Sequence, residues 1–166
     1  MTIADFLSTI LTGQNLALVG AFLAAGLAGI GSAIGVGIVG QAGAGLLTEQ
    51  PNMFGKVLVL QALPATQGIY GLITAFMIMI FSGIMGGTGA ELTVAQGGYF
   101  LMASLPVGIV GLISAKHQAK VSAAGISLIA KQKNEVGKAI TSSALVETYA
   151  IFALLVSLLL IIFYKG

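Results

Sequence analysis

Four long apolar stretches set the limits on what this chain can fold into. Each is longer than the roughly 20 apolar residues that a helix needs to cross a bilayer, and none alternates apolar and polar residues as a half-buried strand does. Of the 166 residues, 57% are hydrophobic and only 7% are charged, which is too little charge to cover a water-facing domain. The sequence therefore predicts an all-α membrane protein with transmembrane helices at 16–47, 54–85, 97–129 and 137–164.

The two halves of the chain repeat one another. When the sequence is shifted by 82 residues, 16–81 aligns with 98–163 without a gap, and about a third of the pairs are identical. The matches include rare polar residues of the interhelical loops, such as Gln50 with Gln132. This pattern predicts a duplicated helical hairpin whose copies have the same orientation in the membrane. The two hairpins are expected in residues 1–90 and 91–166.

Lysine positions indicate the orientation, because cytoplasmic loops carry an excess of positive charge. The loops within the two hairpins hold Lys56, Lys131, Lys133 and Lys138. The opposite side holds Asp5, Glu91 and Lys165. We therefore expect a multi-pass protein of the cell membrane with both hairpin loops in the cytoplasm and both termini outside.

Composition disfavours several classes of function. The absence of cysteine excludes disulfides, thiolate metal sites and thiol catalysis, and a formal net charge of +2 gives no indication of nucleic-acid binding. The segment from Gly35 to Gly40 matches the G-x-G-x-x-G pattern, but it follows no strand and lies inside an apolar helix. We therefore reject a dinucleotide site.

A single acidic residue, Glu147, interrupts the last apolar stretch near its middle. Apart from Lys138, the residues from Val136 to Tyr164 carry no other charge. A carboxylate near the bilayer midplane is energetically expensive, so it is a functional candidate by default. The equivalent position of the first hairpin is Ala65, which predicts one carboxylate and one bound ion per chain.

Oxygen-bearing residues gather on one face of the second helix. Pro64 has no N–H to donate, which predicts a local distortion that frees backbone carbonyl oxygens. Around it a carbonyl, a hydroxyl, an amide and a phenol recur at spacings that share one helix face. These groups belong to Leu63, Thr66, Gln67 and Tyr70. On the third helix, we expect Gln118 to face Glu147.

Together these groups favour a site for a monovalent cation. Hard cations prefer oxygen ligands, and a single negative ligand suits a single positive charge. The surplus of neutral oxygens favours Na⁺ over H⁺, with H⁺ as the alternative, and we expect Tyr70 to hydrogen-bond Glu147. The five oxygens would come from Glu147, Gln67, Thr66, Gln118 and the backbone carbonyl of Leu63.

Three basic side chains flank Gln118. Lys116 and Lys120 each lie about 200° from Gln118 on a helical wheel. If Gln118 faces the carboxylate, these lysines point the opposite way, toward a lumen or a headgroup region. We interpret them and His117 as solvated residues and not as ligands.

The segments Leu63–Gly71 and Val146–Ala150, set in a duplicated hairpin, closely resemble the proteolipid K (c) subunit of bacterial V-type ATPases, most of all the Na⁺-translocating type. The resemblance implies a rotor ring of identical copies. It implies that dicyclohexylcarbodiimide modifies Glu147 and that Tyr70 supports this carboxylate. It assigns the cation ligands to Leu63 (backbone), Thr66, Gln67, Gln118 and Glu147. One departure is Ala65, where similar proteins often have glycine.

The resemblance also implies partners. A stator subunit must supply the cation that displaces the bound ion, an arginine in similar machines, because this chain contains no arginine. This chain would be a non-catalytic subunit with no ATP site. Other subunits would hydrolyse or synthesise ATP and turn a central stalk docked on the cytoplasmic loops at 50–52 and 132–134. Lipid would surround the ring. The alternatives are a proton-translocating ring of the same fold, a self-contained channel or small transporter, and a structural four-helix scaffold.

Overall fold

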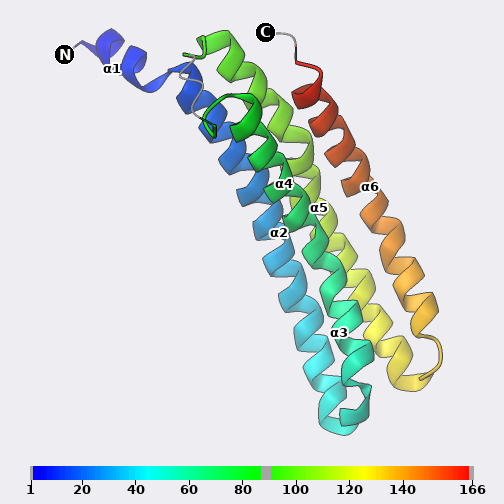
Figure 1. Cartoon of the computed structure of the whole chain (residues 1–166). Helices are drawn as coiled ribbons and strands as arrows, with labels where there is room; N and C mark the ends of the chain where they lie inside the picture. Colours follow the sequence, from blue (N-terminus) through cyan, green and yellow to red (C-terminus); the bar gives the residue numbers. More distant parts are fainter. Residues whose placement is uncertain (1, 87–90, 165–166) are drawn as a thin grey trace.

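The computed structural model describes residues 2–86 and 91–164 and shows a long bundle of helices that run up and down (Figure 1). Within these residues, the segments long and apolar enough to cross a membrane number 4, as predicted. One 3₁₀ turn, Pro51–Met53, precedes α3, and another, Leu63–Ala65, separates α3 from α4. The helices are α1 (Ile3–Ile10), α2 (Gly13–Glu49), α3 (Phe54–Ala62), α4 (Thr66–Phe81), α5 (Val94–Lys131) and α6 (Val136–Ile162).

The two longest helices, α2 and α5, extend at both ends beyond the predicted 16–47 and 97–129. The hydroxyl of Thr12 caps the first turn of α2. Thr93 and Gln96 form a reciprocal capping box at the start of α5. Capping satisfies backbone N–H groups that have no partner within the helix. The two helices therefore begin at these polar residues, a few positions before the apolar stretches start.

Helix α4 ends at Phe81, earlier than the predicted end at residue 85. Gly83 adopts a φ of 74°, a left-handed conformation that glycine adopts readily and that commonly ends helices. The N–H of Met85 then bonds back to the carbonyl of Met79 at 2.8 Å. The predicted boundary between the two hairpins, at residues 90 and 91, falls at the edge of a segment, 87–90, that lies outside the described residues.

The short helix α1 was not predicted. Its first turn is closed by the side chains of Thr2 and Asp5, each of which accepts a hydrogen bond from the other's backbone N–H. α1 lies at an angle to α2, at the end of the bundle where the chain begins (Figure 1). The capping pattern is visible in the sequence, but the helix is too short for the length criterion that identified the membrane spans.

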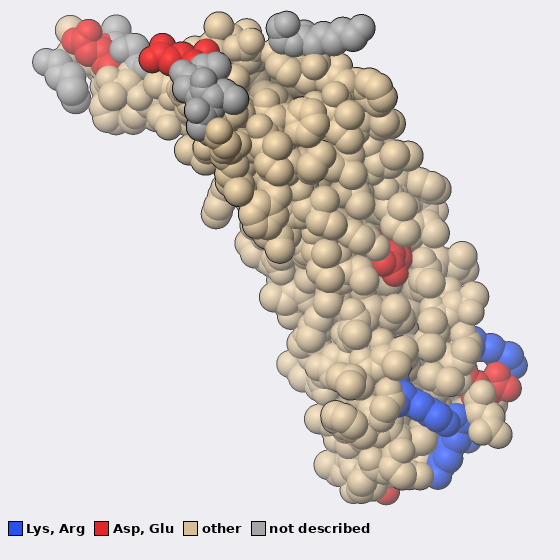
Figure 2. Space-filling view, viewed as in Figure 1, with Lys and Arg blue, Asp and Glu red and all other residues tan. Residues whose placement is uncertain are grey.

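Both hairpin loops lie together at the opposite end of the bundle. The Nζ of Lys56, after the first loop, donates to the carbonyl of Lys133 in the second at 2.5 Å. The amide of Gln50 donates to the carbonyl of Ala130 at 3.3 Å. Basic side chains gather at this end of the surface (Figure 2). The two hairpins therefore run in the same direction; the side of the membrane that each end faces stays a prediction, and Lys165 lies outside the described residues.

Helices α2 and α5 pack with their backbones almost in contact. A methyl group added at Gly20 would lie 2.9 Å from the Cα of Leu101, and one added at Gly31 would lie 2.7 Å from the Cα of Leu112. Such distances are shorter than side chains tolerate, so only glycine permits this approach. The glycine content that would weaken a helix in water here serves close packing.

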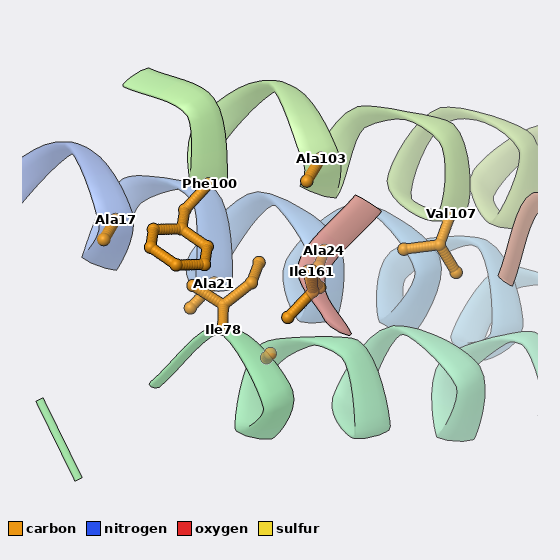
Figure 3. Close-up of a cluster of buried hydrophobic side chains, with 9 residues drawn as sticks. Ala17, Ala21, Ala24, Ile78, Phe100, Ala103, Val107 and Ile161 are labelled. Carbon is orange, nitrogen blue, oxygen red and sulfur yellow. The ribbon is translucent and has the colours of Figure 1, made fainter. Parts of the chain in front are cut away.

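Two apolar clusters fill the bundle at different depths. The first joins α2, α4, α5 and the end of α6, with Phe100 and Ile78 among its largest side chains (Figure 3). The second lies nearer the hairpin loops and includes Leu60 and Ile129. The polar residues singled out above, including Glu147, lie between these two clusters along the helices.

Candidate ion-binding site

Pro64 breaks the second membrane span, as its missing N–H predicted. The chain makes a 3₁₀ turn over Leu63–Ala65 before α4 begins. The hydroxyl of Thr66 donates to the carbonyl of Leu63 at 3.0 Å. The N–H of Gly68 donates to the Oγ of Ser32 on α2 at 2.7 Å. The break therefore brings a backbone carbonyl and a hydroxyl together at this depth, and α2 holds it in place.

Two glutamines connect this break to α6. Gln67 and Gln118 are both fully buried, at 0% exposure. The Nε2 of Gln67 donates to the Oε1 of Gln118 at 2.5 Å, and the Nε2 of Gln118 donates to the Oε2 of Glu147 at 3.3 Å. A buried amide is costly unless it is hydrogen-bonded. Here the two amides are hydrogen-bonded to one another, and that of Gln118 is also hydrogen-bonded to the carboxylate.

Glu147 is half-buried near the middle of α6. Its second carboxylate oxygen, Oε1, accepts a hydrogen bond from the hydroxyl of Tyr70 at 2.6 Å. An acidic patch lies about midway along an otherwise uncharged stretch of the surface (Figure 2). The carboxylate therefore has a donor on each oxygen, one from α4 and one from α5.

The structure thus brings all the site residues expected from the sequence into one network. A long contact of 3.4 Å joins the Thr66 hydroxyl to the Oε1 of Gln67, so the network runs without interruption from the break to α6. Gln67 reaches the carboxylate through Gln118 and not directly. Among the described members of the network, Glu147 is the one carboxylate. Its members are Leu63, Thr66, Gln67, Tyr70, Gln118 and Glu147.

Within the described residues, none of the basic side chains next to Gln118 forms a hydrogen bond or ion pair with a member of the network. Gln118 is buried, Lys116 is half-buried, and His117 and Lys120 are exposed. This arrangement agrees with the expectation that the lysines point away from the carboxylate. Their role as non-ligands stays a prediction.

Several serines that link the helices were not singled out from the sequence. Ser122 on α5 and Ser143 on α6 share a buried hydrogen bond of 2.7 Å. The Oγ of Ser157 on α6 accepts from the N–H of Val107 at 3.2 Å, one residue after Pro106. Their signal is weak, because a single serine in a membrane helix shows neither its direction nor its partner.

Comparison with known proteins gives the family. The family model for the ATP synthase C subunit matches this chain twice, at residues 19–78 and 101–160. The two matches lie 82 residues apart, which is the shift found in the sequence. The duplicated hairpin is therefore confirmed as two copies of one family unit.

Named relatives agree with this result. The chain is 45% identical to the V-type sodium ATPase subunit K of Enterococcus hirae, over 95% of this chain and 97% of that protein. It is 43% identical to the A-type ATP synthase subunit K of Methanocaldococcus jannaschii, over 91% of this chain and 64% of that protein. The ATP synthase subunit c of Thermotoga maritima is 40% identical over 88% of its length but only 40% of this chain. The chain therefore belongs to the ATP synthase C subunit family, in the duplicated form of the V-type ATPase K subunits that its sequence resembles.

Proposed function

We propose that this K subunit carries one Na⁺ per copy across the membrane on Glu147, as part of a ring turned by the ATP-hydrolysing or ATP-synthesising subunits of a V-type ATPase. One observation carries the proposal. A lone carboxylate at mid-span is joined to a helix break by two fully buried amides and a hydroxyl. A proton would need only the carboxyl group and one partner, whereas this network offers several neutral oxygens, the ligands that a hard cation prefers.

Charge balance explains why a single carboxylate suffices. An ionised Glu147 facing lipid is expensive, and a bound Na⁺ makes the site neutral. A divalent ion would leave a positive charge and usually requires more carboxylates. The loaded site can therefore face lipid at low cost, whereas the empty site must face water or a fixed cation.

Loading requires the amide of Gln118 to turn. In this structure its Nε2 faces Glu147 and its Oε1 accepts from Gln67. The terminal torsion of a glutamine side chain is broad and roughly two-fold, so a half-turn would bring the oxygen toward the carboxylate. The amide of Gln67 must turn with it, so that its oxygen accepts from the Nε2 of Gln118 and the two amides stay hydrogen-bonded. We infer that Na⁺ replaces the hydrogen bond between Gln118 and Glu147. Tyr70 keeps its hydrogen bond to the other carboxylate oxygen.

Release requires a positive charge from outside the chain. The sequence contains no arginine, so a stator subunit would supply the cation, an arginine, that attracts Glu147 and weakens its hold on Na⁺. The basic end of the bundle would face the cytoplasm, with both termini outside. There the loops at 50–52 and 132–134 would meet the central stalk.

Carbodiimide labelling tests the ion directly. Dicyclohexylcarbodiimide should modify Glu147 in the purified protein, and the Glu147→Gln variant identifies any labelling of the other acids. Protection by millimolar Na⁺ at neutral pH, with no protection by choline, supports the proposal. Labelling that depends on pH but is indifferent to Na⁺ would assign the same site to H⁺. A native mass corresponding to a single copy would instead favour a self-contained transporter.

A further inference from the structure

Helix α1 separates its apolar and polar residues onto opposite faces. At about 100° per residue, five apolar side chains fall within an arc of about 140°. Asp5 and Thr9 lie on the other side of the helix. An apolar face this wide is typical of a helix that rests on an apolar surface. The apolar residues are Ile3, Phe6, Leu7, Ile10 and, at the C-terminal cap, Leu11.

The bundle does not cover this apolar face. All five apolar side chains are between 45% and 80% exposed, and α1 extends away from the other helices (Figure 1). Exposed apolar side chains that share one face mark a contact with a partner or a membrane. The matches to the family model begin at residue 19, so they give no indication of what this face contacts.

Hydrogen bonds fix the direction of α1 relative to α2. The side-chain amide of Asn15, in the first turn of α2, donates to the carbonyl of Ile10 at 2.9 Å. The N–H of Asn15 donates to the Oγ1 of Thr12 at 3.2 Å, and the N–H of Leu11 donates to the carbonyl of Leu7 at 2.8 Å. These bonds satisfy backbone groups at the end of one helix and at the start of the next. The corner at Leu11 and Thr12 is therefore built into the fold.

The corner lies at the end of the membrane-spanning helices. Gly13 packs against Leu92 and Thr93, so the capped starts of α2 and α5 lie side by side. At the same end, the rings of Tyr99 and Tyr164 pack with their centroids 4.6 Å apart. Tyrosine is enriched at membrane–water interfaces, because its ring is apolar and its hydroxyl is polar. The polar caps and the tyrosines together indicate that the corner between α1 and α2 lies at the level of the lipid headgroups.

Exposed apolar side chains continue from α1 along the first turns of α2. Leu18, Val19 and Phe22 are all exposed, and they belong to a helix that is long and apolar enough to cross a membrane. Lipid that surrounds the start of this span can therefore extend over the apolar face of α1 as well.

We propose that α1 lies in the plane of the membrane surface, with its apolar face at the boundary between headgroups and acyl chains and with Asp5 and Thr9 toward water. Helices with one apolar and one polar face bind membrane surfaces in this way. Helix α1 contains no Lys or Arg, so the binding comes from apolar burial and needs no acidic lipid. The partner is therefore the bilayer itself, and the contact does not depend on which ion Glu147 carries.

Lying on the membrane surface, α1 holds the start of α2 at a fixed depth. Helix α2 runs without a break from Gly13 to Glu49. Along it, the Oγ of Ser32 accepts from the N–H of Gly68, next to the helix break of the ion-binding network. The surface helix therefore acts through α2 on the depth of that network in the membrane.

Tryptophan fluorescence tests this contact, because the chain has no tryptophan of its own. Leu7→Trp places an indole on the apolar face of α1. The matched variant Thr9→Trp places it on the polar face, about 200° away, and both positions are exposed in this structure. The purified protein is inserted into phosphatidylcholine vesicles, either plain or brominated on the acyl chains near the headgroup. Bromine should quench Leu7→Trp at least about twofold, because its indole lies among the acyl chains, whereas Thr9→Trp should lose little emission.

Phe152→Trp is the control for insertion, because Phe152 is exposed on α6 near the middle of that span. Lipid brominated deep in the acyl chains should quench Phe152→Trp more than lipid brominated near the headgroup, and Leu7→Trp should show the opposite order. Phe6→Trp, also on the apolar face, serves if Leu7→Trp disturbs assembly.

Three results would overturn the proposal in a protein whose Phe152→Trp control is quenched. Equal quenching of Leu7→Trp and Thr9→Trp would mean that the two faces of α1 do not differ in their contact with lipid. Unquenched, red-shifted emission from Leu7→Trp would place α1 in water. Unquenched, blue-shifted emission would mean that protein, a second copy or another subunit, covers the apolar face. None of these results bears on Na⁺ binding at Glu147, so the proposed function is tested separately.

Discussion

Replacing Gln118 by leucine should weaken Na⁺ binding strongly while leaving the fold intact. The substitution keeps most of the side-chain volume and removes the amide that connects Gln67 to Glu147. In the proposed loaded state it removes one of five oxygen ligands. A hydrogen bond to a charged group contributes about 1.5–3 kcal/mol, and on that scale losing one ligand raises the dissociation constant about 10- to 100-fold.

The same change leaves the Nε2 of Gln67 buried without its acceptor. An unsatisfied buried group costs about 1–3 kcal/mol, so the variant should also be less stable to heat. Gln61→Leu is the matched control, because the Gln61 side chain packs beside Gly40 on α2 and forms none of the hydrogen bonds of the network. It should leave Na⁺ affinity within about twofold of the wild type, a margin well under the 1.4 kcal/mol of a tenfold change.

The assay is the Na⁺ concentration that halves the rate of carbodiimide labelling of Glu147. It measures affinity at the site and needs no partner subunits. A shift of less than about threefold for Gln118→Leu, below 1 kcal/mol, would refute the assignment of this amide as a ligand. An equal shift in the Gln61→Leu control would show that the effect comes from the loss of any membrane amide.

Three further outcomes are expected. Thr66→Val should weaken Na⁺ protection of labelling about tenfold, because it removes an oxygen ligand. The control Thr148→Val removes the equivalent hydroxyl of the second hairpin, which lies outside the network, and should leave Na⁺ protection unchanged. Equal effects of the two variants would refute the assignment of Thr66 as a ligand. Gly31→Ala should lower thermal stability in detergent by about 1–3 kcal/mol. Gly26→Ala should be neutral, because the added methyl group would lie in ordinary contact with Phe22, at 3.6 Å. Equal stability of the two variants would contradict the close α2–α5 packing. Hydrogen bonds from Thr2 within the α1 cap hold the pKa of Asp5 below its usual value of 3.8. The ionised carboxylate therefore stabilises α1 at pH values above 3.8, and this stabilisation is lost as the pH falls through the lower pKa of the folded protein. Hydrogen exchange of residues 3–10 should accelerate below that point, and an unchanged rate would contradict the role of the cap.

The main features of the fold could be predicted because membrane insertion leaves few choices. Apolar length set the four spans, and the 82-residue shift set the two hairpins. Pro64 predicted the break in the second span, since no rearrangement can give proline a donor. Glu147 identified the site, because an isolated acid in a membrane helix has few structural explanations.

Other features depend on contacts that a helical wheel does not contain. Spacing placed Gln67 on an oxygen-bearing helix face, and Gln118 was expected to face Glu147. The order of the network, with Gln118 between Gln67 and the carboxylate, depends on side-chain torsions. The end of α4 was set by the backbone of Gly83, and glycine in a membrane helix indicates close packing as often as a stop.

The most direct test of the central claim is a Na⁺-binding isotherm of the purified oligomer, measured from acidic to alkaline pH. The account predicts saturation at one Na⁺ per chain at neutral pH, weaker apparent binding as protons compete at low pH, and no saturable binding for Glu147→Gln. Absence of saturable Na⁺ binding at every pH, in a protein whose Glu147 still reacts with carbodiimide, would contradict it and leave a proton as the cargo.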